Sequence, residues 1–225
     1  MQEPGGVGKG AETRAERTRA AITEAAAEQF LGAGFLGASM DDIAALAGVS
    51  KQTVYAHFES KEALFVAMVR GLTGGTGDEF RSRVADPTGE RPVSEFLIDF
   101  ATSQLQIVMT PRLMQLRRLV IGEVGRFPEL GRALHEQGPQ RSIDRLAAAF
   151  AVYCGLGALA IEDLDQAATF FTWLIMGGPV NNVMLLGDKA ILDEADIERH
   201  AQEAVRIFLA AYGASGRPAG KPLMA

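Results

Sequence analysis

Cysteine and histidine are scarce in this sequence. Its 225 residues include one cysteine, Cys154, and three histidines, His57, His135 and His200, which lie far apart along the chain. A single cysteine excludes an intrachain disulfide and a thiolate metal cluster, and it suits a reducing cytoplasm. Asp196 and His200 share one face of an expected helix, but two ligands are weak evidence for a metal site. We therefore expect neither a metal nor a cofactor.

Positive charge is also in deficit. The chain carries 22 Lys and Arg against 28 Asp and Glu, a formal net charge of −6. This acidity excludes a protein coated in positive charge that grips any polyanion, but it leaves room for a small local site. Residues 1–70 hold 7 basic and 9 acidic groups, so even this part is not basic. If the chain binds DNA, we expect its affinity for random sequence to be weak.

Motifs of catalysis and nucleotide binding are missing. The sequence contains no G-x-x-x-x-G-K-[ST] loop and no G-x-S-x-G elbow. Gly155-Leu-Gly157 is a lone G-x-G without a preceding strand. No set of acids, bases and nucleophiles is clustered along the chain, so we predict that the protein is not an enzyme.

Long uncharged runs are rare, and the exception is Gln166 to Gly187, with 22 residues. Its length would permit a membrane span. The polar Asn181 and Asn182 and the breaker Gly177-Gly178-Pro179 would then sit in hydrocarbon, which is unfavourable. We expect a buried helix of a soluble core or subunit interface instead. The N-terminus has no apolar signal-peptide region, so we predict a cytoplasmic protein.

Strand signals are nearly absent, whereas helical periodicity is widespread. The sequence therefore predicts an all-α chain of about nine helices. The glycine-rich stretch Thr73–Gly77 is expected to weaken or bend the fourth helix. Beyond it, the expected helices run over residues 93–110, 112–127, 129–154, 165–187 and 193–212.

The most informative segment is Ser39 to Phe58, which has the pattern of two short helices joined by a tight turn. Ala44 is small enough for close approach, and Gly48 can supply the positive φ that ends the first helix. Val49 fills the angle between the helices, and Ser50 caps the second one. Ordinary helical hairpins share this spacing and polarity, so the pattern alone leaves that alternative open.

The residues from Ile43 to Phe65 follow the pattern IAxxAGVSKxTVYxHFxxKExLF. This pattern resembles the helix-turn-helix DNA-binding domain of the TetR family of bacterial regulators, and the match extends over about Arg14 to Arg70. The resemblance implies a DNA-binding domain over 14–72 and a ligand-binding and dimerisation domain over 73–212. The composition of the two ends predicts a flexible arm over residues 1–13 and a flexible tail over 213–225.

The resemblance also implies roles for single residues. Gln52 stands where many members carry glycine, and its amide could contact adenine. Met40 replaces the common threonine and cannot donate a hydrogen bond. His57 could equally serve packing, and Arg14, Arg17 and Arg19 could equally pair with Glu12 and Glu16 in solvent. The residues expected at the DNA are Ser39, Met40, Lys51, Gln52, Thr53, Tyr55, His57 and Lys61.

The C-terminal part should form a helical bundle. Its stretch Pro111–Leu130, together with Asp165–Phe170, resembles the C-terminal domain of AefR-like TetR regulators. The expected pocket for an apolar effector is lined by Phe96, Phe100, Met109, Met114, Arg117, Glu123, Phe170, Trp173 and Met176, any of which could instead be ordinary core. The expected dimer interface contains Val180, Val183, Met184, Ile207 and Phe208.

Together these features predict a homodimeric regulator that binds double-stranded operator DNA. In this family such a protein is most often a repressor that a small molecule releases from a palindromic site. Asp41, Asp42 and Glu59 flank the recognition helix and should reduce the affinity for random DNA. The alternatives are a helical enzyme and a protein-interaction module whose hairpin does not bind DNA.

Overall fold

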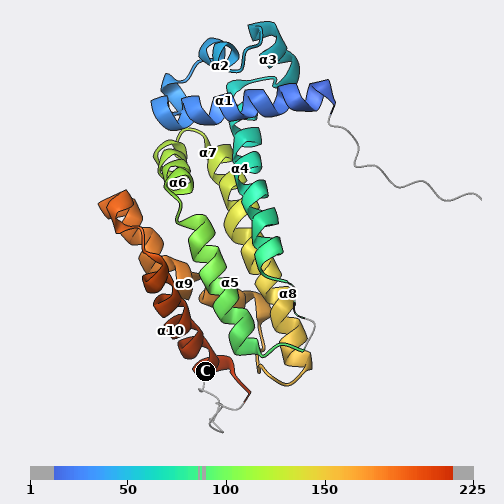
Figure 1. Cartoon of the computed structure of the whole chain (residues 1–225), viewed down its shortest axis with the longest axis vertical. Coiled ribbons are helices and arrows are strands. Elements are labelled where there is room, and N and C mark those ends of the chain that lie inside the picture. Colours follow the sequence, from blue (N-terminus) through green and yellow to red (C-terminus); the bar gives the residue numbers. More distant parts are fainter. Residues whose placement is uncertain (1–12, 86, 88–89, 215–225) are drawn as a thin grey trace, which may run out of the picture. The chain divides into compact units, whose positions relative to one another are not determined.

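The computed structural model describes residues 13–85, 87 and 90–214, without the side chains of residues 75–83. Throughout these ranges the regular structure is helical and contains no β-strand, so the predicted all-α fold is confirmed (Figure 1). The chain divides into two compact units, Met1–Met68 and Val69–Ala225.

The predicted terminal arms lie outside the described residues, except for Thr13, Gly213 and Ala214. These three residues are tied to the neighbouring structure. Thr13 caps the first helix, and the Ala214 N–H donates to the Ala158 carbonyl at 3.1 Å. Gly213 forms an isolated β-bridge with Leu159.

Helices of the first unit start at polar caps. The Thr13 hydroxyl accepts the Glu16 N–H at 3.2 Å, and the Glu16 carboxylate accepts the Thr13 N–H at 2.6 Å. This reciprocal pair is a capping box. Serine hydroxyls cap the next three helices. The elements are α1 (Arg14–Gly37), α2 (Met40–Leu46), α3 (Lys51–His57) and α4 (Lys61–Arg83), which begins in this unit.

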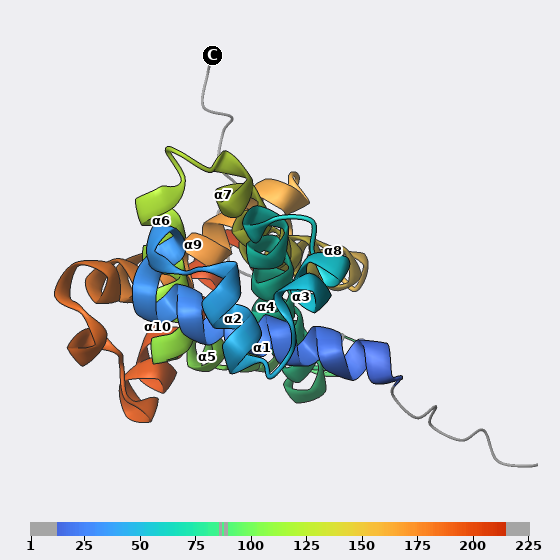
Figure 2. The ribbon, with the colours of Figure 1, turned by 90° about the horizontal axis from the view of Figure 1, so that it is seen from above.

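The core of the first unit is aromatic. Phe30 and Phe35 of α1 and Phe65 of α4 are at most 1% exposed, and their ring centroids lie 5.1, 5.4 and 5.6 Å apart. Two of the three pairs meet edge to face, an arrangement that aromatic rings favour. α2 packs against α1 and α3 packs against α2, as Figure 2 shows from above. The aromatic cluster thus joins α1 to the start of α4, and α2 and α3 pack onto this pair through α1.

The second unit is a bundle of longer helices. α8 packs against α9, and α10 packs against α5. A π-helical segment and a short 3-10 turn interrupt the series. The elements after α4 are α5 (Val93–Val108), α6 (Pro111–Glu123), α7 (Pro128–His135), η1 (Glu136–Gln140), α8 (Arg141–Gly155), α9 (Leu164–Leu186), η2 (Asp188–Ala190) and α10 (Glu194–Tyr212).

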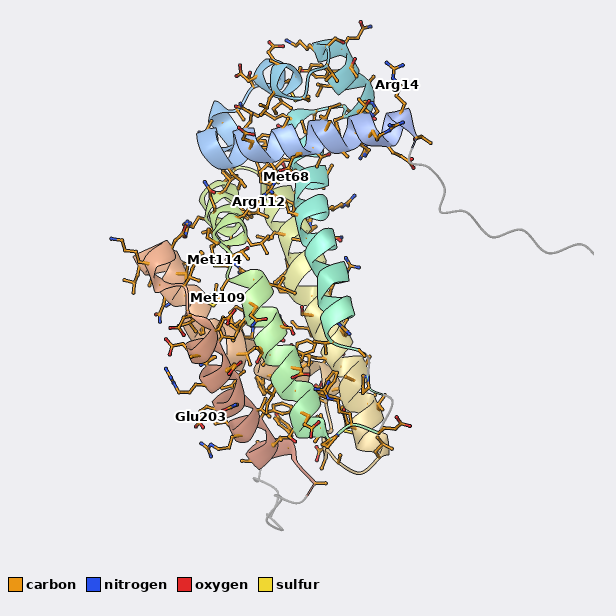
Figure 3. All side chains as sticks on the ribbon, in the orientation of Figure 1. Arg14, Met68, Met109, Arg112, Met114 and Glu203 are labelled. Atoms are coloured by element: carbon orange, nitrogen blue, oxygen red, sulfur yellow. The ribbon has the colours of Figure 1, made fainter. Side chains whose placement is uncertain are left out.

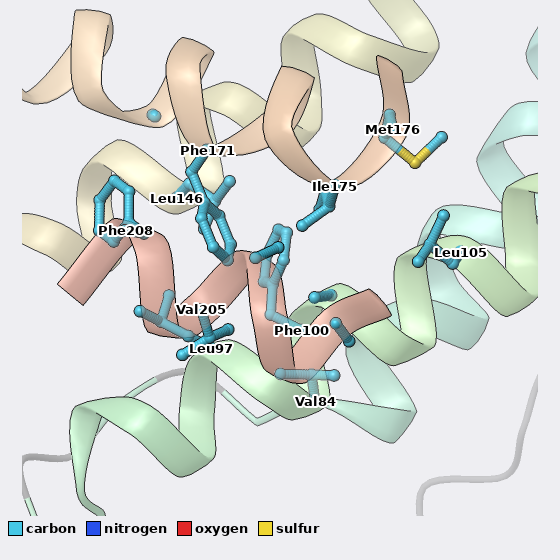
Figure 4. Close-up of a cluster of buried hydrophobic side chains, with 14 of the residues drawn as sticks. Val84, Leu97, Phe100, Leu105, Leu146, Phe171, Ile175, Met176, Val205 and Phe208 are labelled. Atoms are coloured by element: carbon cyan, nitrogen blue, oxygen red, sulfur yellow. The ribbon is translucent and has the colours of Figure 1, made fainter. Parts of the chain in front are cut away.

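Buried side chains of α5, α8, α9 and α10 gather in the core of this unit, as Figure 4 shows. Phe100 of α5, Leu146 of α8 and Phe171 of α9 are fully buried, and Phe208 of α10 is 3% exposed. The Phe171 and Phe208 rings lie 4.9 Å apart between their centroids. Burial of each such side chain is worth roughly 1.5–3 kcal/mol, so this cluster is a major source of stability for the bundle.

The expected single helix over residues 129–154 is divided in the structure. α7 and α8 are joined by the π-helical turn η1, which contains Pro139. Proline has no N–H to donate and its ring clashes with the preceding turn, so a regular α-helix cannot continue through it unchanged. In the π-helical turn the hydrogen bonds span five residues instead of four, so the regular α-helical pattern is interrupted at Pro139. The Thr73–Gly77 stretch, in contrast, does not end α4, which continues to Arg83.

Among the described helices, α9 alone is long and apolar enough to cross a membrane. It also belongs to the core of the second unit, where Phe171, Ile175 and Val183 are fully buried. A core helix passes the same length and composition test, so this feature is weak evidence for a span.

Candidate nucleic-acid interface

α2 and α3 meet at a tight turn centred on Gly48. Gly48 has φ 67°, a left-handed conformation that a side chain would strain. Its N–H donates to the Ala45 carbonyl at 3.2 Å, and the Val49 N–H donates to the Ala44 carbonyl at 3.0 Å. Ala44 is only 4% exposed, so a larger side chain would not fit there. The turn fixes the direction in which α3 leaves α2.

Serine hydroxyls then hold the first turn of each short helix. Ser50 Oγ accepts the Thr53 N–H at 3.1 Å, and Ser39 Oγ accepts the Asp42 N–H at 3.0 Å. Ser39 Oγ also donates to the Asp42 carboxylate at 2.6 Å. Each cap satisfies a backbone donor that the helix leaves free and is worth about 1 kcal/mol. Ser39 is therefore occupied by capping in this structure.

α3 has a buried side and an exposed side. Val54 is fully buried and Phe58, which follows the helix, is 4% exposed, so these residues anchor α3. Lys51, Gln52 and Tyr55 face outward, and 47% of Tyr55 is exposed. Ammonium, amide and phenol groups can donate to phosphates and base edges. The exposed side of α3 therefore has the chemistry of a recognition helix.

Lys51 is already engaged by a carboxylate. Its Nζ lies 2.9 Å and 3.0 Å from the two carboxylate oxygens of Asp41, the second residue of α2. This hydrogen bond raises the pKa of Lys51 above its usual range, so the ammonium stays charged. The sequence indicated that Asp41 is near the recognition helix, but it did not indicate this pairing, which joins residues ten apart across a turn.

Two residues predicted to contact DNA are less exposed than Lys51, Gln52 and Tyr55. Met40, the first residue of α2, is 7% exposed, so its side chain is packed against its own chain, and its role at the phosphate backbone stays a prediction. Burial of this apolar side chain is favourable. Thr53 is half-buried, and its hydroxyl lies 2.8 Å from Ser50 Oγ. The Thr53 hydroxyl therefore takes part in the cap of α3 through its contact with Ser50.

Arg19 clamps the end of α3 onto α1. Its Nη1 donates to the His57 carbonyl at 3.2 Å, and its guanidinium carbon lies 4.4 Å from the centre of the Phe58 ring. A cation at a helix C-terminus interacts favourably with the carbonyls that the helix leaves free. His57 is half-buried next to this clamp. Arg19 thus supports the end of α3 from the surface of α1, and Arg14 and Arg17 are exposed on the same helix, where Figure 3 labels Arg14.

Lys61 has a similar supporting position at the start of α4. Its Nζ donates to the Ala38 carbonyl at 2.9 Å and lies 3.5 Å from the Leu36 carbonyl. It also lies 4.8 Å from the centre of the Phe35 ring. The ammonium therefore stabilises the end of α1, and only the part of its charge that remains accessible could attract a phosphate.

In the second unit, the residues expected to line an effector pocket separate into two groups. Phe170 and Trp173 are 54% and 65% exposed, so in the single chain they lie outside the core in which the other predicted apolar residues are buried. Adjacent helical residues point about 100° apart, and the neighbouring Phe171 is the one that fills the core. The buried members, at most 8% exposed, are Phe96, Phe100, Met109, Met114 and Met176, with Met109 and Met114 labelled in Figure 3.

Polar groups also lie in this bundle. Arg117 is half-buried, and burial lowers the pKa of its guanidinium. Glu123 is half-buried too, but no ion pair joins it to Arg117 in the part of the chain that the structure describes. Gln104 and Thr172 are 5% and 6% exposed, and Gln104 Oε1 and Thr172 Oγ1 have no hydrogen-bond partner among the described residues. Such groups are rare in folded proteins.

The residues expected at a dimer interface also differ in exposure. Val183 is fully buried and Phe208 is 3% exposed, so both belong to the core of their own chain, and contact with a second copy stays a prediction. Val180 and Met184 are half-buried, and Ile207 is 43% exposed. The large apolar side chains that α9 and α10 leave exposed are Phe170, Trp173, Leu185, Leu186 and Ile207.

Two family models match this chain. The model for bacterial regulatory proteins of the tetR family matches residues 22–68, which include the helix-turn-helix. The model for the C-terminal domain of AefR-like transcriptional repressors matches residues 95–214. The chain therefore belongs to the TetR family and is a DNA-binding transcriptional regulator. TetR regulators bind operator DNA as dimers and in general are not enzymes.

Solved structures and curated relatives agree with this assignment. A proposed TetR-family regulator from Mesorhizobium loti is 35% identical, with a TM-score of 0.83 over 90% of this chain and 100% of that chain. The flavonoid-responsive regulator FrrA is 34% identical, with a TM-score of 0.74 over 88% of this chain and 97% of that chain. An uncharacterized HTH-type transcriptional regulator of Mycobacterium tuberculosis is 27% identical over 81% of each chain.

Proposed function

We propose that this protein is a cytoplasmic repressor that binds a palindromic operator as a homodimer and leaves it when a small aromatic molecule binds the second unit. The observation that carries the DNA-binding part is the arrangement of α3. Val54 and Phe58 anchor the helix, and Lys51, Gln52 and Tyr55 point outward from its other side. Two such helices in a dimer would enter successive major grooves about 34 Å apart.

Dimerisation is proposed through the exposed apolar faces of α9 and α10. Trp173 is 65% exposed, and Leu185 and Leu186 are 75% and 69% exposed. Large apolar side chains gathered on neighbouring helices mark interaction surfaces in soluble proteins. α9 carries no charged residue between Asp165 and Asp188, so a second copy of the same helix meets no like charge there. The packing of four helices from two chains would bury this face.

The effector is proposed to be an aromatic compound with hydroxyl groups. Phe96 and Phe100 offer apolar walls, and Gln104 Oε1 is a buried acceptor without a partner among the described residues. A hydroxyl group of the ligand could donate to this oxygen, and the aromatic rings of the ligand could pack against the two phenylalanine rings. The relative FrrA is described as flavonoid-responsive, which supports a test with flavonoids first.

The rival functions lack comparable support. An enzyme would need a set of acids, bases or nucleophiles that converge on one place, and the family to which the chain belongs is in general not enzymatic. A protein-interaction module would not require the polar, outward-facing donors of α3. Both rival functions predict no specific binding to DNA, so an assay of DNA binding discriminates between them and the proposed repressor.

The experiment is a gel shift of the purified full-length chain on the DNA directly upstream of its own gene, at physiological salt. We expect a retarded complex containing two chains, and we expect flavonoids to release it. Tyr55→Ala should weaken the complex more than tenfold, while Tyr55→Phe, which keeps the ring, should weaken it less. No shift on that DNA or on a duplex selected from a random library would overturn the proposal.

A further inference from the structure

The ion pair between Lys51 and Asp41 lies at the exposed start of α3. Lys51 is the first residue of α3 and Asp41 is in the first turn of α2, and their side chains are 56% and 64% exposed. Both carboxylate oxygens are within 3.0 Å of the ammonium nitrogen. The residue expected to meet a DNA phosphate thus already holds two anionic oxygens of its own chain.

A carboxylate offers a lysine the same kind of partner that a phosphate does, namely oxygens that share a negative charge. Lys51 must therefore leave Asp41 to bind DNA, or share its charge between the two anions. In either case, binding of Lys51 to a phosphate weakens or breaks its ion pair with Asp41. An exposed pair of this kind is weak, so the exchange can occur at ordinary salt concentrations.

We propose that Asp41 is an affinity-setting residue, an internal counter-anion that competes with the DNA backbone for Lys51 and keeps the binding of random sequence weak. This inference rests on the proposed DNA-binding function. A lysine that neutralises a phosphate releases about 0.9 condensed cation from B-DNA. If Asp41 is left unpaired beside the DNA, it recruits a cation in return, and the net release becomes small.

Other carboxylates nearby do not have this role. The Asp42 carboxylate accepts a hydrogen bond from the Ser39 hydroxyl, and the Asp42 N–H donates to the same Ser39 oxygen, so a change of Asp42 would disturb the start of α2. Glu59 follows the buried Phe58, is exposed, and forms no ion pair in the described structure. Glu59→Gln therefore removes the same formal charge as Asp41→Asn without releasing a lysine, and it is the matched control.

The test measures fluorescence anisotropy of the full-length chain with a labelled random-sequence duplex of about 30 base pairs, long enough for two half-sites. Wild type, Asp41→Asn, Lys51→Gln, the double variant and Glu59→Gln are titrated across a range of salt concentrations. Because Asp41 is mostly exposed, the isosteric change should not affect folding, and thermal unfolding of each variant checks this point.

We expect Asp41→Asn to bind the random duplex about threefold more tightly per protomer and about tenfold more tightly as a dimer. Its plot of log affinity against log salt should be steeper by about 1.8, from two freed lysines. Lys51→Gln should cost more affinity in the Asp41→Asn background than in wild type. Glu59→Gln should change affinity modestly and should not couple to Lys51.

Two results would overturn this inference alone. In the first, wild type binds DNA, but Asp41→Asn matches Glu59→Gln in affinity and in salt dependence. In the second, Lys51→Gln has the same cost in both backgrounds. If wild type binds neither this duplex at any salt concentration nor the upstream DNA of the gel shift, the proposed function fails as well, so the two failures are distinguishable.

Discussion

Arg19 offers a sharp test of how the recognition helix is supported. The sequence left open whether this arginine reaches DNA or lies in solvent, and the structure places it under the end of α3. Its Nη1 donates to the His57 carbonyl at 3.2 Å, and its guanidinium lies over the Phe58 ring. Arg19→Ala should therefore loosen α3, although Arg19 lies on a different helix.

The expected magnitude follows from the two contacts. A hydrogen bond from a charged group contributes about 1.5 kcal/mol at the low end of its range, which suits an exposed site. A cation over an aromatic ring at an exposed site adds about 0.5–1 kcal/mol. The sum, about 2 kcal/mol, corresponds to a roughly 30-fold change in the equilibrium for opening the end of α3.

Hydrogen exchange measured by mass spectrometry is the suitable assay. The chain's one tryptophan, Trp173, lies in the second unit, so its fluorescence does not report on α3. Peptides covering residues 51–58 should exchange roughly 30-fold faster in Arg19→Ala than in wild type, because opening of α3 governs their exchange.

Arg17→Ala is the matched control, since Arg17 is exposed on the same helix and its side chain forms no hydrogen bond or ion pair with residues 13–85. It should leave the exchange of residues 51–58 unchanged. Equal exchange in Arg19→Ala and Arg17→Ala would refute the clamp. A loss of DNA affinity in Arg19→Ala without faster exchange would show that Arg19 contacts DNA directly.

Further predictions concern three other features. Gly48→Ala should destabilise the protein by about 1 kcal/mol in thermal unfolding, because a side chain is strained at a φ of 67°. Gly74→Ala should instead stabilise the protein by about 0.5–1 kcal/mol, because Gly74 lies inside α4 with open space around it. Trp173→Ala should raise the dimer dissociation constant at least tenfold in analytical ultracentrifugation; an unchanged constant would exclude this face as the interface. Gln104→Leu should keep or raise stability, because Gln104 Oε1 has no partner among the described residues, and should abolish release by flavonoids; a loss above about 2 kcal/mol would show that the oxygen is bonded.

The helix-turn-helix could be predicted because its determinants are local. A glycine at the left-handed position and serines at the caps are specific for a turn of this geometry, and the structure places Gly48, Ser39 and Ser50 in such positions. Short-range backbone chemistry of this kind can be deduced from neighbouring residues alone. The all-α fold of the chain follows from the same local patterns.

The direction of individual side chains could not be predicted where a helix is apolar on every side. Phe170 and Phe171 are adjacent, yet one is 54% exposed and the other is fully buried. α9 carries no charged residue to mark its outer face over residues 166–187, so periodicity gives no answer there. The same reason explains why Val183 was expected at a dimer interface but lies in the core.

Contacts between distant residues were also beyond the sequence. Arg19 and Lys61 belong to types that bind phosphate, but here both donate to backbone carbonyls at helix ends. Only the packing of α1 against α3 and α4 brings these groups together. A count of basic residues in the sequence therefore overestimates the number of cationic groups that are free to bind DNA.

The central claim is that two copies of α3 read one operator. The direct measurement is a footprint of the wild-type chain on the duplex that it binds most tightly, taken from the upstream DNA or selected from a random library. The mass of the complex is determined in parallel. We predict two protected half-sites about 10 base pairs apart, centre to centre, in successive major grooves, and at least two chains per duplex. A single protected patch bound by one chain, or protection that Tyr55→Ala leaves unchanged, would contradict the account.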